Sequence, residues 1–89
     1  MIGVYISAVP MTTEQYQAID DEVTADGLPA GLKLHTCFRE GEALAVFDVW
    51  ESKEDFEAFG AKLMPAVRNA GVTMPEPIFV EMVDYEVVP

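Results

Sequence analysis

The chain has 89 residues and a mass of 9.8 kDa, enough for a single domain over residues 1–89, because two separate cores would each be too small to fold alone. Sixteen acidic residues against five basic ones give a net charge of -11. Such a surface repels phosphate groups, so the composition argues against nucleic acid and anionic membranes as partners.

Cysteine content and apolar run lengths narrow the class of protein further. Cys37 is the only cysteine, which rules out an internal disulfide, and no cluster of cysteine and histidine has the spacing of a zinc site. No segment approaches the roughly 18–20 apolar residues of a membrane span, and the first residues lack the basic start of a signal peptide. Because an unpaired cysteine fits a reducing interior, we expect a cytoplasmic protein. Because no zinc-site spacing is present, we expect it to bind no metal.

The N-terminal third of the chain predicts a strand, a helix and a stiff loop. Residues Ile2–Val9 form a β-rich apolar run that a proline ends. Thr12 and Gln15 have the spacing of a capping box, so a helix begins here and runs toward Asp26 and Gly27. Residues at helical spacing give this helix an inward face: Tyr16, Ile19 and Val23.

A hairpin is predicted next. Residues Lys33–Arg39 form the second strand, residues 40–42 the turn, and Ala43–Trp50 the third strand. The third strand, ALAVFDVW, is apolar at both odd and even positions, whereas a strand with one wet face should alternate. We therefore expect it to be buried on both faces.

The second helix is predicted to begin at Ser52, which has Asp55 in the partner position of a capping box. Pro65 lies inside this helix and leaves the carbonyl of Ala61 without its usual donor. We therefore expect a kink or a short break near Gly60–Met64. Four residues form its apolar stripe: Phe56, Phe59, Leu63 and Val67.

After a proline-containing linker, residues Ile78–Val88 predict the fourth strand. The order βαββαβ is that of the ferredoxin-like fold, in the α+β class. Right-handed crossovers place both helices on one face of a four-stranded antiparallel sheet with strand order 4-1-3-2.

The face of this sheet away from the helices is expected to need a partner. The fourth strand, like the third, is apolar in both registers. Four strands about 4.8 Å apart and about 25 Å long offer a face of roughly 500 Å², near the largest apolar patch of a soluble monomer. Two such faces packed together approach the burial of a stable interface, so we predict a homodimer through the sheet face.

The tract HTC...VFDVWESKEDFEAF, followed by LMPAV and Gly71, resembles small bacterial proteins of the dimeric α+β barrel superfamily. That superfamily includes the antibiotic biosynthesis monooxygenase-like proteins, and the resemblance covers most of the chain from Gly31 to Tyr85. It implies a dimeric barrel, with activities that range from cofactor-independent oxygenases through haem-degrading and isomerase-like proteins to members with no known activity. Haem-degrading relatives need a helix-borne histidine, whereas His35 is predicted on a strand. We therefore expect no cofactor.

The length of the hairpin turn decides which polar residues meet. With a two-residue turn, His35 faces Asp48 directly and Lys33 faces Trp50, with Cβ atoms about 5 Å apart in each pair. A three-residue turn would instead set His35 against Phe47. We favour the two-residue turn, because it also matches small apolar neighbours across the hairpin.

In the favoured register, Asp48 would orient His35 as a general base on a bound organic acid or phenol. The alternative is a polar pair that satisfies itself inside the dimer. Trp50 is either a cavity wall that stacks on a planar ligand or a core anchor. Three hydroxyl-bearing residues are expected to line the same space: Tyr5, Ser7 and Tyr85. For Tyr5 the alternative is that its ring points into the dimer core.

Three functions stay open at this stage. The first is a cofactor-independent oxygenase-like enzyme acting on a small aromatic or polyketide-like ligand. The second is a non-catalytic binding or accessory protein for a small hydrophobic molecule, and the third is a purely structural homodimer. No phosphate loop, dinucleotide fingerprint or hydrolase elbow is present. Cys37 is predicted in the middle of a strand without a nearby base, and we expect it to be an inert small hydrophobe.

Overall fold

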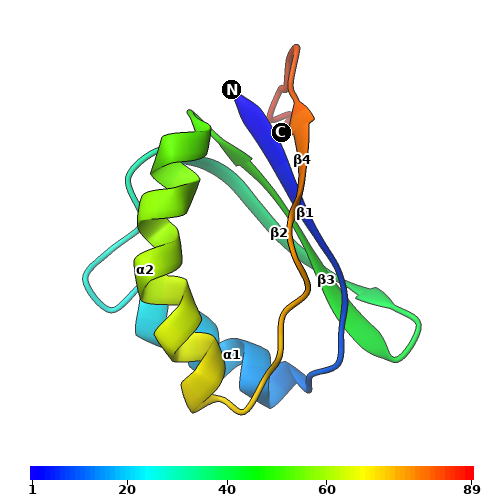
Figure 1. Ribbon diagram of the computed structural model, residues 1–89. Coiled ribbons are helices and arrows are strands. Elements are labelled where there is room, and N and C mark those ends of the chain that lie inside the picture. Colours follow the sequence, from blue (N-terminus) through cyan, green and yellow to red (C-terminus); the bar gives the residue numbers. More distant parts are fainter.

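A computed structural model describes all residues from Met1 to Pro89 and has the predicted βαββαβ order. Figure 1 shows two helices on one side of a single sheet. The elements are β1 (Ile2–Val9), α1 (Thr13–Val23), β2 (Leu32–Glu40), β3 (Ala43–Trp50), α2 (Lys53–Asn69) and β4 (Ile78–Glu81).

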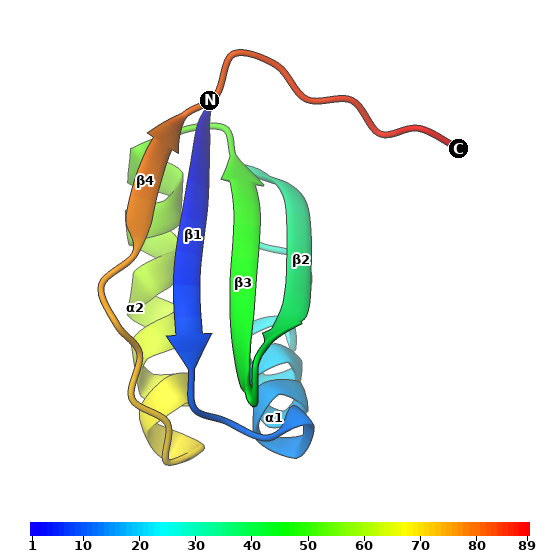
Figure 2. The ribbon, with the colours of Figure 1, turned by 90° about the vertical axis from the view of Figure 1, so that its right-hand side faces the viewer.

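The sheet has the strand order β2-β3-β1-β4, which is the predicted order read from the other edge. All three pairs of neighbouring strands are antiparallel. Figure 2 looks onto the face that the helices leave uncovered, with both helices behind the sheet. The predicted ferredoxin-like fold is therefore confirmed.

Both helices begin where their capping residues predict. The Thr12 side chain accepts a hydrogen bond from the Gln15 backbone at 3.1 Å, and the Gln15 side chain accepts one from the Thr12 backbone at 2.8 Å. Ser52 accepts from the backbone N–H of Asp55 at 3.2 Å in the same way. These bonds satisfy backbone donors that have no partner inside the helix.

Helix α2 is unbroken through Pro65, so of the predicted kink or short break near Gly60–Met64 the break does not occur. A proline removes one hydrogen bond and crowds the turn before it, which costs about 3 kcal/mol or more. The buried residues Ala66 and Val67, directly after the proline, are 2% and 3% exposed and hold the last turns of the helix against the core.

Strand β4 ends at Glu81, well short of the predicted end at Val88. The reason is the register with β1, in which Glu81 faces Ile2. One further backbone bond joins Met82 to the carbonyl of Met1 at 3.2 Å, and later residues have no facing backbone in β1. The segment after β4 therefore leaves the sheet, as Figure 2 shows, and Val83 is 97% exposed.

A bulge in β1 decides which of its residues face the core. Val4 and Ile6 face the helices, and after the irregularity between Ile6 and Val9 the fully buried Val9 lies against Leu44. Ala8 takes up the extra residue with a positive φ of 45°. A bulge shifts the alternation of a strand by one residue, which brings Val9 into the core in place of Ala8.

The core lies between the sheet and the two helices, and it is filled by aliphatic residues together with Trp50 and Phe56. The predicted inward faces are confirmed, since Ile19 and Val23 of α1 and Val67 of α2 are buried in it. Neither helix combines the length and apolar character needed to cross a membrane.

Candidate functional site

The hairpin between β2 and β3 has the two-residue turn that the favoured register requires. Glu40 pairs with Ala43, which leaves Gly41 and Glu42 as the turn. Gly41 has a φ of 65°, as expected for the first central residue of a type II′ turn. His35 consequently opposes Asp48, and the predicted pairing across the hairpin is confirmed.

The register prediction is wrong at the far end of the hairpin. Trp50 opposes Leu32 instead of Lys33, because an irregularity between Leu32 and Leu34 adds one residue to β2. Lys33 instead forms an ion pair with Glu51 at 2.9 Å. The bulge lies beyond His35, so it leaves the pairing of His35 with Asp48 intact.

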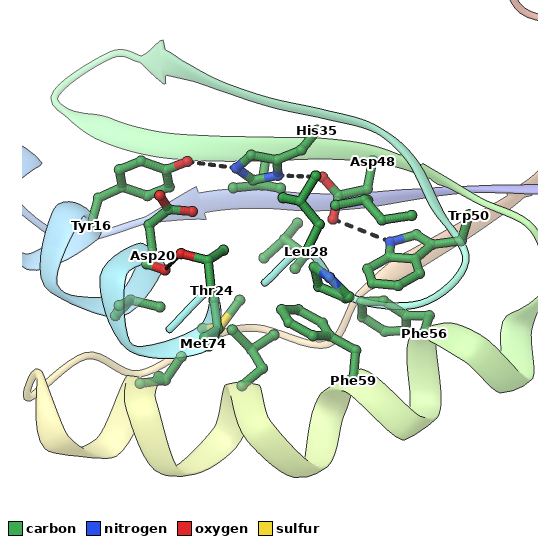
Figure 3. A pocket seen from close by; sticks show the side chains of 18 of the residues that line it. Tyr16, Asp20, Thr24, Leu28, His35, Asp48, Trp50, Phe56, Phe59 and Met74 are labelled. Atoms are coloured by element: carbon green, nitrogen blue, oxygen red, sulfur yellow. Dashed lines mark hydrogen bonds and ion pairs between the residues drawn. The ribbon is translucent and has the colours of Figure 1, made fainter. Parts of the chain in front are cut away.

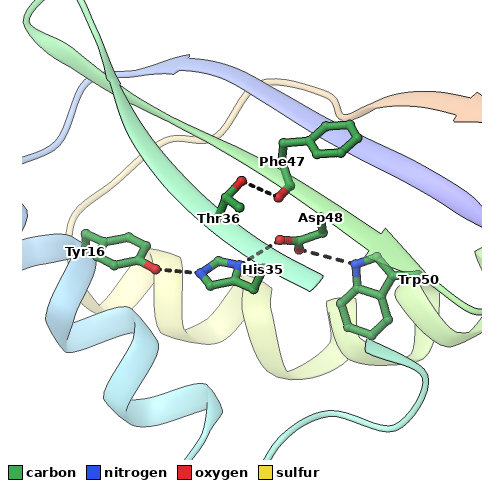
Figure 4. A network of polar contacts seen from close by, with 6 residues as sticks. All are labelled: Tyr16, His35, Thr36, Phe47, Asp48 and Trp50. Carbon is green, nitrogen blue, oxygen red and sulfur yellow. Dashed lines mark hydrogen bonds and ion pairs between the residues drawn. The ribbon is translucent and has the colours of Figure 1, made fainter. Parts of the chain in front are cut away.

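Asp48 is the centre of a polar network on the helix-facing side of the sheet (Figure 4). Its carboxylate is almost fully buried, with 5% of the residue exposed. His35 Nδ1 lies 2.6 Å from Asp48 Oδ1, and Trp50 Nε1 donates to Asp48 Oδ2 at 3.2 Å. Because a carboxylate only accepts hydrogen bonds, His35 Nδ1 carries the proton, and both oxygens of Asp48 are satisfied.

Tyr16 completes this network from helix α1. Its hydroxyl lies 2.5 Å from His35 Nε2. The hydroxyl donates to Nε2 when the imidazole is neutral and accepts from it when the imidazole is protonated. The sequence placed Tyr16 on the inward face of its helix but gave its hydroxyl no partner. The missed signal was that a buried tyrosine hydroxyl normally finds one.

The network shifts the pKa values of its members. The hydrogen bond to Asp48 raises the pKa of His35 above its ordinary value of 6.5, while burial acts in the opposite direction. Burial raises the pKa of Tyr16 to about 12, and the charges of Cys37, Asp20 and Asp48 add to the rise. The phenol is therefore neutral at physiological pH.

His35, Asp48 and Trp50 line one cavity of about 110 Å³ between the sheet and the helices (Figure 3). Trp50 packs against Phe59 at 5.2 Å between ring centroids and against Phe56 at 5.7 Å. The volume is comparable with engineered apolar cavities of about 150 Å³ that bind benzene. Fifteen of its 20 lining residues are hydrophobic, which suits a small, mostly apolar ligand.

The other predicted ligand-binding residues lie elsewhere. Tyr5, Ser7 and Tyr85 are not among the residues that line the cavity, so the prediction that they share this space is wrong. Tyr5 and Ser7 alternate with the inward-facing Val4 and Ile6 and thus lie on the uncovered face of β1. There the Tyr5 hydroxyl donates to Glu40, and Tyr85 follows the end of β4.

Two further observations bear on the chemistry of the site. Cys37 packs against the core, and burial raises the pKa of its thiol, which makes it a poor nucleophile. The structure contains no group of three or more histidine, cysteine, aspartate or glutamate side chains placed to hold a metal ion.

Comparison with solved structures gives the fold an independent test. A candidate antibiotic biosynthesis monooxygenase from Chloroflexus aurantiacus superposes with a TM-score of 0.68 at 16% identity, over 99% of this chain and 98% of the other. The chain has the fold of that protein. Rv0793 from Mycobacterium tuberculosis gives 0.69 at 12% identity, over 97% and 98% of the two chains. No protein-family model and no curated protein matches the sequence.

A third similar structure has a stated activity. SnoaB, a cofactor-independent oxygenase from Streptomyces nogalater that was crystallised as a mutant, superposes with a TM-score of 0.63 at 16% identity, over 94% of this chain and 93% of the other. The fold resemblance inferred from the sequence is thus confirmed. At these identities the likeness concerns the fold, and the chemistry has to be argued from the cavity.

Proposed function

We propose that this protein binds a small aromatic molecule in the cavity and acts on it as a cofactor-independent oxygenase, with His35 as the general base. The observation that carries the proposal is the hydrogen-bonded chain from Tyr16 through His35 to Asp48 along the wall of a mostly apolar cavity. A base oriented by a buried carboxylate, whose hydrogen bond raises the pKa of the imidazole, is what proton removal from a phenol or an activated carbon requires.

The geometry favours a route for the substrate proton. Asp48 fixes the proton of the neutral imidazole on Nδ1, which leaves the lone pair of Nε2 free to accept. In the resting state Nε2 accepts from the Tyr16 hydroxyl. A substrate proton therefore reaches His35 either through Tyr16 as a relay or directly, once the hydroxyl has moved aside.

Dioxygen would be the second reactant. Removal of one substrate proton leaves an anion, which gives an electron to dioxygen, and the two radicals combine into a peroxide anion with a new C–O bond. The protonated His35 then returns the proton to the peroxide, which gives the hydroperoxide. Loss of water then breaks the O–O bond and leaves a carbonyl on the ring, so a CH₂ group and one O₂ become C=O and H₂O. The protein has to supply only the base and a cavity without water.

The test is a panel of small ring compounds, screened by thermal shift and then in an oxygen electrode. We expect compounds that stabilise the wild type to be consumed together with oxygen, and His35→Gln to bind them while losing most of the oxygen uptake. Thr36→Val is the matched control, because Thr36 neighbours His35 but bonds to the backbone of Phe47 at 2.7 Å. Equal oxygen uptake by wild type and His35→Gln would refute the role of His35.

A non-catalytic binding role is the second candidate. Its support is that the network is complete without a ligand, since no buried polar side-chain atom lacks a hydrogen-bond partner. Under this alternative the panel yields ligands that bind wild type and His35→Gln without any oxygen uptake.

We further propose that the protein works as a homodimer through the uncovered face of the sheet. Three large apolar side chains there are partly open to solvent, Phe38 at 42%, Ile78 at 53% and Val80 at 46% exposure. They lie on β2 and β4, on either side of the buried β3, so the apolar surface spans the width of the sheet. The free Cys37 suits a reducing compartment, and we place the activity in the cytoplasm.

A further inference from the structure

One carboxylate in the cavity has no partner. Asp20 of α1 lines the cavity beside Tyr16 and Thr24, as Figure 3 shows. The Thr24 hydroxyl donates to the backbone carbonyl of Asp20 at 2.7 Å. Neither a hydrogen bond nor an ion pair engages the Asp20 carboxylate. Asp48, by contrast, has both oxygens occupied. Asp20 is therefore the charged group of the cavity that is free to bind a ligand.

The permanently charged side chains that line the cavity are all acidic. Its lining contains Asp20 and Asp48 but no lysine or arginine. His35 is the one group able to carry a positive charge, and both of its ring nitrogens already have partners, in Tyr16 and Asp48. The pKa of Tyr16 is raised mainly by burial, and that of His35 mainly by the hydrogen bond to Asp48; the charge of Asp20 adds a smaller rise to each. An anionic ligand would meet repulsion here and no unoccupied cationic partner.

Aromatic rings supply the other half of the site. Trp50, Phe56 and Phe59 lie together on the wall across from α1. The faces of such rings attract cations as well as apolar groups. Leu28, in the loop after α1, is 81% exposed, whereas Trp50 is fully buried, so the cavity opens toward that loop and ends at the indole. A ligand entering here places its ring near Trp50 and its polar end near the half-buried Asp20.

We infer that Asp20 anchors the polar end of the ligand and that the cavity takes a small ring compound carrying a protonated amine, in preference to an alcohol or a carboxylate. This inference rests on the proposed cavity function but not on its chemistry. A half-buried charge-assisted hydrogen bond contributes enough to change affinity by about tenfold or more.

The test uses three probes that share one ring and differ in charge: benzylamine, benzyl alcohol and benzoate. Their dissociation constants are measured by NMR titration for wild type, Asp20→Asn and Asp21→Asn. Asp21→Asn is the matched control, because Asp21 is the exposed neighbour on the same helix and its removal changes the net charge equally. Asp20→Asn keeps the shape of the side chain and breaks no existing bond.

We expect wild type to bind benzylamine about tenfold more tightly than benzyl alcohol, and benzoate more weakly than either. Asp20→Asn should bind the amine and the alcohol alike, and Asp21→Asn should keep the wild-type order within about twofold, because an exposed charge is screened by salt. Benzoate binding as tightly as benzylamine, or an unchanged order in Asp20→Asn, would overturn the inference.

The outcomes also separate this inference from the proposed function. Tight binding of benzyl alcohol without a preference for the amine removes the role of Asp20 and leaves the cavity function standing. An amine preference without oxygen uptake by any ligand removes the oxygenase proposal and leaves the role of Asp20. If none of the three probes binds at millimolar concentration, both proposals fall.

Discussion

His35 and Asp48 face each other across the β2–β3 hairpin, with 2.6 Å between Nδ1 and Oδ1. The carboxylate is buried and the imidazole borders the cavity, so the pair links the interior of the sheet to the space where a ligand would lie. This arrangement makes the stability of the fold depend on the protonation state of a group in the proposed active site.

Asp48→Asn should therefore destabilise the protein more at low than at high pH. The Asp48 hydrogen bond raises the folded-state pKa of His35 above 6.5, so the protonated imidazole stabilises the fold below that pH, and the contribution is lost as the pH rises through the folded-state value. We expect a loss of about 1–3 kcal/mol in the free energy of unfolding on the acid side. Urea unfolding at about pH 5.5 and about pH 8.5 measures it. An equal loss at both pH values would contradict the linkage.

Tyr16→Phe should reduce the alkaline sensitivity of the fold. With a folded-state pKa of about 12 against 10.0 for a free tyrosine, wild type gains stability from the neutral phenol below pH 10.0 and loses it as the pH rises toward 12. Absorbance titration of the phenolate should show that the transition missing in Tyr16→Phe is one of high pKa. Tyr5→Phe serves for comparison, because that hydroxyl bonds to Glu40 on the opposite face.

Val80→Lys should dissociate the proposed dimer without unfolding the monomer. The lysine places a charge on the apolar face of each protomer, on the edge strand β4, where a partner would have to desolvate it. Met64→Lys is the control, because Met64 is exposed to a similar extent, 50% against 46%, but lies on α2. Sedimentation at micromolar concentration should show wild type and Met64→Lys as dimers and Val80→Lys as a monomer. Three identical profiles would place any interface elsewhere.

Pro65→Ala should stabilise the protein. Because α2 is continuous through this position, alanine restores an N–H to a helix that already has the right geometry. Proline is about 3 kcal/mol less favourable than alanine inside a helix, and we expect a gain of about 1–3 kcal/mol by denaturant unfolding. A loss of stability would mean that α2 bends at the proline in a way that the core requires.

Local signals in the sequence predicted the features that short-range geometry decides. Thr12 and Ser52 mark both helix starts because caps act within one turn, and Gly41 marks a turn whose length sets the pairing of His35 with Asp48. The alternation of strands also placed Trp50 toward the helices, where it lines the cavity.

Features that depend on distant partners were missed or misplaced. The end of β4 depends on where β1 begins. The bulge at Lys33, between Leu32 and Leu34, shifts the partner of Trp50 although it contains neither glycine nor proline. The bond between Tyr16 and His35 joins a helix to a strand 19 positions away, and its existence depends on how α1 packs on the sheet. No periodicity in the sequence carries that information.

The two-residue turn also constrains how this chain can change over evolutionary time. Inserting a single residue between Glu40 and Ala43 would either move the phenyl ring of Phe47 opposite His35 or force a compensating bulge. Loops such as the one around Leu28 can lengthen one residue at a time. This turn tolerates only length changes that keep its number of residues even. Lineages that keep the paired imidazole and carboxylate should therefore show variable lengths everywhere except here.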